Sequence, residues 1–521
     1  MSDSKGMEGL KKHKVGVLGV VGIIYTMCCA GAYGIEDMIS LAGPGMTILA
    51  LCVLPFIWAI PQALACAELG SAIPEEGGPY VWMQRAFGEF WGFQMGLWSI
   101  VANYLFVPTL IVLAGDYVGT AAGWSWWATF AFKIGLILIF GFINWRGVKD
   151  VSAVSTAMSV IIFLAFTSIV IIGFTNWNYS PVEPFIAEGE SPLVSMSYAF
   201  VIGMWMYGGY SQMSAVAGEL EDPQVIPKAL MIAFPLSMFT YIASTIGGVA
   251  AVGQWYDWGT NGVSWVDVGY VVSPAVGIAF VGVAFLGQVS IFNSYLGTTA
   301  RTVFVMSVDK LAPKVFSRCS KTTGVPDVAL LSIIIACFLF CTFDFSMIVM
   351  LTVQVAFFAD AGIILCVLVL RNKEPYINRP YKAKMPKWLF NAMCGVILVV
   401  IVIFMYLNGT EYFFMGTIMI FIGPLLFWLL KRSYQEKKGG KVLNPGDNKK
   451  IAFLYFLIAV ICIIGYFFFG WYGDANYFEE TYGFTGIIQV FINCIGIIGI
   501  VSVVIGFIFY RADKKELKET A

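Results

Sequence analysis

The stretch Cys28-Cys29-Ala30-Gly31-Ala32-Tyr33-Gly34-Ile35-Glu36-Asp37 lies inside the first long apolar run of the chain. A helix that crosses a bilayer must satisfy its own backbone hydrogen bonds, because the hydrocarbon core offers no water to its N–H and C=O groups. Two carboxylates and two glycines at membrane depth therefore predict a break in this helix that lines a cavity inside the protein. Interrupted helices of this kind form the substrate sites of transporters.

The composition is typical of an integral membrane protein. Hydrophobic residues make up 59% and charged residues 12% of the 521 residues, and the mean hydropathy is +0.81. The chain has one histidine, His13, which argues against histidine-based metal sites and against Ser-His or Cys-His catalysis. We therefore expect neither an enzyme nor a bound metal or cofactor. The 11 cysteines lie mostly in apolar runs and are expected to be buried thiols. The first apolar run is too long for a cleavable signal.

Fourteen apolar runs are long enough to cross a bilayer, which takes about 20 residues each. They lie at 15–42, 45–71, 89–116, 124–145, 152–175, 192–217, 229–252, 273–306, 326–343, 346–370, 387–407, 410–431, 450–472 and 483–510.

The distribution of lysine and arginine indicates how these runs are oriented. Short cytoplasmic loops are enriched in both residues. Here they occur in the leader, in alternate connections and in the tail, whereas the intervening connections contain none. This pattern predicts an even number of crossings and cytoplasmic N- and C-termini. We expect the protein in the plasma membrane. Lys133 and Arg301 are the two basic residues that fall within runs away from the run ends.

A second interrupted run contains Gly203-Met204-Trp205-Met206-Tyr207-Gly208-Gly209-Tyr210-Ser211-Gln212. The first run is directed from inside to outside and the sixth from outside to inside, so the two breaks take corresponding places in two oppositely oriented halves. Such a pair is typical of inverted repeats with a substrate site near the bilayer midplane. The alternative is that these glycines only permit close packing of helices. The occurrence of both breaks favours the substrate site.

The sequence therefore predicts an all-α integral membrane protein with inverted five-helix repeats, broken helices 1 and 6, and about 14 transmembrane helices. The expected parts are a cytoplasmic leader (1–14), the first repeat (15–175), the second repeat (192–370), four C-terminal helices (387–510) and a cytoplasmic tail (511–521).

Several longer motifs resemble those of the amino acid/polyamine/organocation (APC) permeases, in the expected order over about residues 15–430. They are Ala67-Glu68-Leu69-Gly70 through Pro79-Tyr80-Val81-Trp82, Ala217-Gly218-Glu219-Leu220-Glu221-Asp222-Pro223, Ala300-Arg301-Thr302-Val303-Phe304 and Arg379-Pro380-Tyr381. The resemblance implies a secondary active transporter that works by alternating access. It also implies that backbone groups at both breaks hold the substrate, and that Trp205 is an aromatic gate; its alternative role is packing.

The identity of the substrate depends on a few polar positions. The phrase Gly34-Ile35-Glu36-Asp37 is similar to the polyamine-uptake branch of the family, yet Asn103 and Ser211 stand where that branch has acidic residues. Because these two residues lack the negative charge that a polyamine would require, we favour a small amino acid, carried by proton symport or by exchange for an amine. A polyamine or another biogenic amine is the alternative, and a non-transporting membrane sensor is a remote one.

Three carboxylates within the runs have two possible roles each. Glu36 and Asp37 follow the first break, where they either cap the restarting helix or bind a substrate ammonium or a proton. Asp360, in the tenth run, forms a structural ion pair or couples transport to protons, since an unpaired charge there costs at least about 2.5–3.5 kcal/mol. Lys133 either snorkels or binds a carboxylate. Glu68 and Glu219, at cytoplasmic helix ends, are expected to accept hydrogen bonds from loop backbone; contact with the substrate is the alternative.

The predicted site combines these positions. The expected substrate contacts are Ala30, Gly31, Ala32, Tyr33, Glu36, Asp37, Asn103, Trp205, Gly208, Gly209 and Ser211, and the expected coupling or gating residues are Trp205, Asp360 and Glu36. The partners are a small amino acid or amine, protons and the lipid bilayer, without nucleic acid; the sequence leaves the oligomeric state open.

Overall fold

The structure is a computed structural model. It describes residues 16–29, 31–75, 77–146, 151–209, 225–259, 262–320, 322–434, 443–473, 483 and 486–520. Over these residues the regular secondary structure is helical, apart from one isolated β-bridge between Trp258 and Val263. The prediction of an all-α protein is confirmed.

Eleven helices of the described residues are long and apolar enough to cross a membrane. The first is α3 (Pro44–Leu54), which continues through a π-helical turn (Pro55–Ala59) into α4 (Ile60–Ala72). The others are α6 (Glu89–Ala121), α7 (Trp126–Arg146), α8 (Val151–Thr175), α11 (Val225–Ala251), α13 (Pro274–Val308), α15 (Phe345–Lys373), α16 (Lys387–Leu407), α17 (Thr410–Tyr434), α18 (Asp447–Tyr472) and α20 (Gly486–Thr520). The chain is thus a multi-pass membrane protein. The remaining three predicted runs contain shorter helices.

The first of these runs is broken where the sequence predicts it. Helix α1 (Val17–Cys28) ends before the glycines, and α2 (Ile35–Ala42) begins after them. Gly31 and Gly34 have φ angles of +99° and +97°, which other residues rarely adopt. A Cβ on Gly34 would lie 2.6 Å from the Phe345 ring. The break therefore requires glycine for its backbone conformation and for space.

The sixth run is also interrupted. Helix α9 (Pro192–Met206) ends in a turn, in which the Gly208 N–H donates to the Trp205 carbonyl oxygen at 3.1 Å, and Gly209 has a φ of +92°. Residues 210–224 lie outside the described residues. The ninth run contains α14 (Asp327–Phe340), which is shorter than a full crossing.

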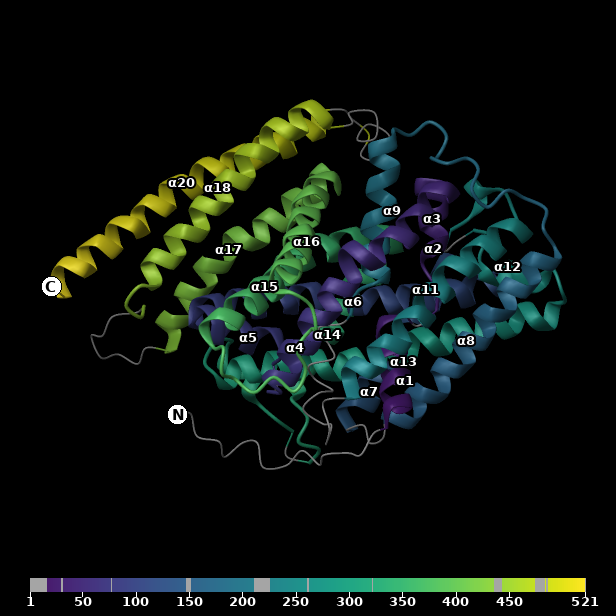
Figure 1. The fold of residues 1–521 in the computed structure, drawn as a ribbon, viewed down its shortest axis with the longest axis horizontal. Helices are drawn as coiled ribbons and strands as arrows, with labels where there is room; N and C mark the ends of the chain where they lie inside the picture. Colours follow the sequence, from purple (N-terminus) through teal and green to yellow (C-terminus); the bar gives the residue numbers. More distant parts are fainter. Residues whose placement is uncertain are drawn as a thin grey trace.

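Helices that are distant in sequence surround the two breaks. Helix α1 packs against α8 and α11, while α2 and α3 pack against α9; α13 and α15 both pack against α6. Helices α18 and α20 lie side by side at one end of the molecule and contact α17 (Figure 1). Some of the described connections contain short helices; they are α5 (Pro79–Phe87), α12 (Trp265–Tyr270) and two 3-10 turns, Trp255–Asp257 and Lys314–Ser317. The interrupted helices are therefore central and the C-terminal pair is peripheral.

Candidate substrate site

A cavity of about 40 Å³ lies where α1 and α9 end. It is lined by residues of α1 and the break that follows it, of the end of α9, and of α6, α11 and α13: Cys28, Cys29, Tyr33, Phe106, Leu110, Trp205, Met206, Gly208, Gly209, Tyr241, Gln288 and Ile291. A cavity of this size has room for water molecules, provided that it offers them polar partners. Both predicted breaks therefore contribute to one cavity.

The C-terminal ends of two helices meet at this cavity. The last carbonyl groups of a helix lack intrahelical partners and carry a partial negative charge. The Tyr241 hydroxyl lies 3.2 Å from both the Cys28 and Cys29 carbonyl oxygens and 2.9 Å from the Met206 carbonyl oxygen. One hydroxyl has one proton for these three oxygens, so acceptor capacity remains at both helix ends. Such an environment stabilises a cation.

Three side-chain polar atoms that line the cavity are buried without a hydrogen-bond partner among the described residues. They are Tyr33 Oη, Trp205 Nε1 and Gln288 Oε1. Tyr33 is 1% exposed and Gln288 3% exposed. Buried polar atoms in folded proteins are nearly always paired with protein or ordered water. These atoms therefore indicate a position for a hydrogen-bonding ligand or for water, and the amide oxygen in particular accepts from a donor such as an ammonium group.

Aromatic rings form one wall of the cavity. The Trp205 ring lies 5.6 Å from Phe106 and 5.3 Å from Phe345, measured between ring centroids. Tyr33 makes an edge contact of 5.0 Å with Phe166. Aromatic faces attract cations, with energies of about 0.5–2 kcal/mol. Trp205 thus lines the cavity, as an aromatic gate requires, and it also packs against neighbouring rings. Both predicted roles fit this position, so the role as a gate stays a prediction.

Glu36 caps the helix that restarts after the first break. Its Oε2 atom accepts the Gly34 N–H at 2.7 Å, its Oε1 atom accepts the hydroxyl of Tyr117 on α6, and its side chain is fully buried. It does not line the cavity. Of the two roles predicted for this residue, the geometry favours capping, since a carboxylate neutralises the positive end of a helix. Asp37 has different surroundings, because it is half-buried near Gly259.

The other predicted site residues are dispersed. Gly31 lies against Phe166, and the Ala32 carbonyl accepts the Trp265 Nε1–H at 2.9 Å; neither residue lines the cavity. Asn103 is partly buried on α6 and is also not part of the lining. Ala30, Ser211 and Glu219 lie outside the described residues.

Among the cavity residues that the predicted site did not include, Tyr241 and Gln288 carry a side-chain hydroxyl and a side-chain amide. Tyr241 and Gln288 lie within long apolar helices, and their approach to the breaks depends on how α11 and α13 pack. An amide in a transmembrane run is itself unusual, so Gln288 could have been singled out.

Lys133 and Asp360, two of the charged residues within the helices, have different kinds of partner. Lys133 Nζ lies 2.7 Å from Asp116 Oδ1, which links α7 to α6 and selects the carboxylate-binding alternative over snorkelling. Asp360 accepts a hydrogen bond from the Gln62 side-chain amide on α4 and does not line the cavity. The predicted structural ion pair for Asp360 is therefore not observed within the described part of the chain.

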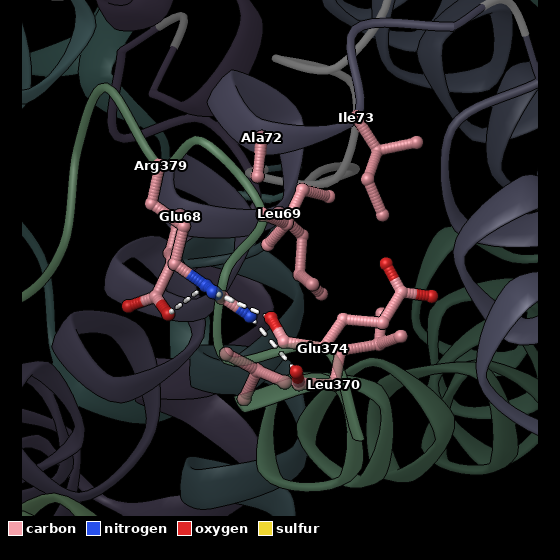
Figure 2. A pocket seen from close by; sticks show the side chains of 9 residues that line it. Glu68, Leu69, Ala72, Ile73, Leu370, Glu374 and Arg379 are labelled. Atoms are coloured by element: carbon pink, nitrogen blue, oxygen red, sulfur yellow. Dashed lines mark hydrogen bonds and ion pairs between the residues drawn. The ribbon is translucent and has the colours of Figure 1, made fainter. Parts of the chain in front are cut away.

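Glu68 has the predicted contact to loop backbone, but ion pairs that the sequence did not indicate accompany it. Its carboxylate forms ion pairs with Arg371, at the end of α15, and with Arg379, whose Nε lies 3.3 Å away; the contact to loop backbone, Ala383 N–H, is long at 3.5 Å. Figure 2 shows Glu68 facing Arg379 beside a small pocket, with Arg379 also bonded to the carbonyl oxygens of Leu370 and Glu374. Two arginines therefore compensate one buried carboxylate and join α4 to α15.

A neighbouring ion pair lies closer to the solvent. Arg85, on α5, contacts Glu374 at 2.8 Å. The hydrogen bond from the Arg85 guanidinium holds the pKa of the Glu374 carboxyl below its ordinary value. Lys373 donates to the Ala86 carbonyl oxygen at 3.2 Å. Together these contacts attach α5 to the end of α15.

Replacement of Tyr241 by Phe is expected to destabilise the protein by about 1–3 kcal/mol, because buried carbonyl groups lose their donor. These are the carbonyl groups of Cys28, Cys29 and Met206. The change in unfolding free energy is measured in detergent micelles. Tyr466→Phe is the matched control, since Tyr466 is 38% exposed. Equal stability of both variants would show that the hydroxyl does not join the two breaks.

The fold and the cavity between two helix breaks are those of a transmembrane solute carrier. A model described as amino acid permease matches residues 15–427. The chain therefore belongs to the amino acid permease family, within the APC superfamily, and is a transporter and not an enzyme. The resemblance noted from the sequence is confirmed, and α18 and α20 lie beyond the matched region.

The relatives include several plant proteins. Polyamine transporter RMV1 of Arabidopsis thaliana is 28% identical over 435 residues, which cover 82% of this chain and 86% of the relative. A probable polyamine transporter of the same plant is 25% identical over 475 residues, covering 87% of this chain and 94% of the relative. Polyamine transporter PUT1 of Oryza sativa subsp. japonica is 31% identical over 267 residues, covering 49% of each chain.

Proposed function

We propose that this chain is a secondary active transporter of a polyamine or a related small amine, working by alternating access. One observation carries the proposal: the cavity lies at the C-terminal ends of α1 and α9, where carbonyl oxygens suit an ammonium group. The positive end of α2 is already neutralised by the Glu36 carboxylate. The start of α2 is thus a poor site for the carboxylate group of an amino acid substrate.

The relatives support the same substrate class, because RMV1 and PUT1 are named as polyamine transporters. The earlier preference for an amino acid rested on Asn103 and Ser211. Asn103 does not line the cavity, and Ser211 lies outside the described residues. The polyamine alternative is therefore favoured over the amino acid.

The finer architecture is part of this proposal. It has inverted repeats over 15–175 and 192–370, about fourteen crossings, cytoplasmic termini and a location in the plasma membrane. The helix ends at Cys28 and Met206 support it, since they occupy corresponding positions in the two halves. The absence of lysine and arginine from alternate connections supports the orientation.

The test is counterflow in proteoliposomes that contain the purified full chain. Vesicles loaded with unlabelled putrescine are expected to accumulate radiolabelled putrescine from outside, and external spermidine is expected to compete. Alanine and leucine should compete weakly. Inhibition by amino acids alone, with both polyamines inert, would reverse the assignment of substrate. A sensor or a channel would show no counterflow at all.

A further inference from the structure

We infer that Asp360, together with Gln62, forms the proton-binding site that couples transport to a pH gradient; this inference rests on the proposed function as a secondary active transporter. Asp360 lies at the centre of α15, a helix of 29 residues, and so about 20 Å from either end at 1.5 Å per residue. An ionisable side chain at that depth is costly to maintain without a partner or a function.

The surroundings of Asp360 favour a protonated, neutral carboxyl group over a permanently charged carboxylate. The Gln62 side-chain amide donates to Asp360 Oδ1, and no described residue is bonded to Oδ2. Within the described ranges, the carboxyl is paired with no lysine or arginine, because Lys133 is bound to Asp116 and Arg371 to Glu68. A neutral amide cannot compensate a full negative charge, whereas a proton on Oδ2 removes it.

Asp360 is not completely enclosed by neighbouring residues. The residue is partly exposed, whereas Gln62 is 3% exposed. A carboxyl group exchanges protons with water only when one of its oxygens can be reached, and the amide holds the other oxygen in place. In the coupling cycle a proton from water on one side forms the O–H bond at Oδ2. The same bond breaks after the conformational change, and the proton leaves to water on the other side.

Other titratable groups near Asp360 are few. The Cys66 thiol of α4 is near enough to interact electrostatically with Asp360, and it also interacts with the Cys28 thiol of α1. The remaining helices packed on α15, which are α5, α6, α9, α16 and α17, place no charged side chain of the described residues against it. We therefore attribute a change of protonation at this position to Asp360.

The position also joins two helices that contact different parts of the site. Helix α15 packs against α9, whose end lines the cavity, and α4 belongs to the crossing that follows α2. The bond between Gln62 and Asp360 changes with protonation, since a carboxylate is a stronger acceptor than a carboxylic acid. Protonation thus alters the contact between these helices without a change in the substrate cavity itself.

The experiment compares D360N with the wild type in proteoliposomes. Counterflow requires no net proton movement, so D360N is expected to keep it and to lose the stimulation of uptake by an imposed pH gradient. D360E is expected to restore part of the stimulation. A pH-stimulated uptake in D360N equal to the wild type would overturn the inference, and so would loss of counterflow in the folded variant.

A second readout does not depend on the substrate. The infrared band of a protonated carboxyl group should titrate in the wild type and be absent in D360N, while D327N, a matched change at the start of α14, should retain it. The same band in all three proteins would overturn the inference even if polyamine counterflow is observed. Absence of polyamine counterflow with the predicted infrared result would instead overturn only the assigned substrate.

Discussion

Replacement of Glu68 by Gln is expected to destabilise the protein by about 3–5 kcal/mol, because it leaves buried cations without their counter-charge. The Glu68 carboxylate is 1% exposed and is shared by Arg371 and Arg379, which are 10% and 8% exposed. Arg371 additionally lies over the Phe390 ring at 3.3 Å, so it cannot leave for solvent without losing that contact. The measurement is the free energy of unfolding in mixed micelles.

The control is an ion pair with the same chemistry at the surface. Arg318 lies 3.3 Å from Asp327 and is 73% exposed, and such pairs contribute about 0–1 kcal/mol. D327N should therefore change the stability little.

A triple change of Glu68, Arg371 and Arg379 to Leu, Met and Met should recover much of the stability lost in E68Q, because a buried apolar group needs no counter-charge. Equal stability of E68Q and the wild type would contradict this account of the contact between α4 and α15.

The second large effect is expected at Glu36. Its two carboxylate oxygens accept from the Gly34 N–H and from the Tyr117 hydroxyl. In E36Q the amide offers one acceptor oxygen, so one buried donor loses its partner at a cost of about 1–3 kcal/mol. The negative charge at the start of α2 is also removed. We expect a lower stability and a reduced rate of transport, with an unchanged dependence of the rate on pH.

One further variant, Y117F, and the pH profile of E36Q separate the roles of this carboxylate. Y117F removes one donor and leaves the cap on Gly34 intact, so it should lose less stability than E36Q. E36Q is expected to retain its pH profile, because the capping role involves no change of protonation. A flattened pH profile in E36Q would show that Glu36 binds the substrate ammonium or the coupled proton. Normal stability and normal uptake in both variants would exclude the cap.

The break in the first helix was predictable because its causes are local. Glycines with positive φ and carboxylates at membrane depth conflict with an unbroken helix wherever they occur, and Gly34 and Glu36 show this within three residues. The end of α9 near Gly208 has the same local origin. Eleven of the fourteen apolar runs also matched helices long enough to cross a membrane, since a bilayer sets the length of a crossing.

The partners of polar side chains were not predictable. Glu68 and Arg371 are far apart in sequence, and nothing local indicates that the ends of α4 and α15 meet. The same is true of Tyr241, which reaches carbonyl oxygens at both breaks from the middle of α11. Asn103 was chosen by family position, yet the residues of the same helix that line the cavity are Phe106 and Leu110. These contacts depend on how each helix is rotated about its own axis. The sequence pattern of a buried helix does not define that rotation.

The central claim is that the cavity between the two helix ends binds an ammonium group. It is tested most directly by binding of radiolabelled putrescine to purified wild-type protein and to Q288L. Gln288 Oε1 is a buried acceptor at this cavity, so its loss should weaken putrescine binding about tenfold, which corresponds to 1.4 kcal/mol. Q489L, a matched change on the exposed surface of α20, should bind normally. Saturable binding of alanine or leucine without binding of putrescine, or equal putrescine affinity in Q288L and the wild type, would contradict the claim.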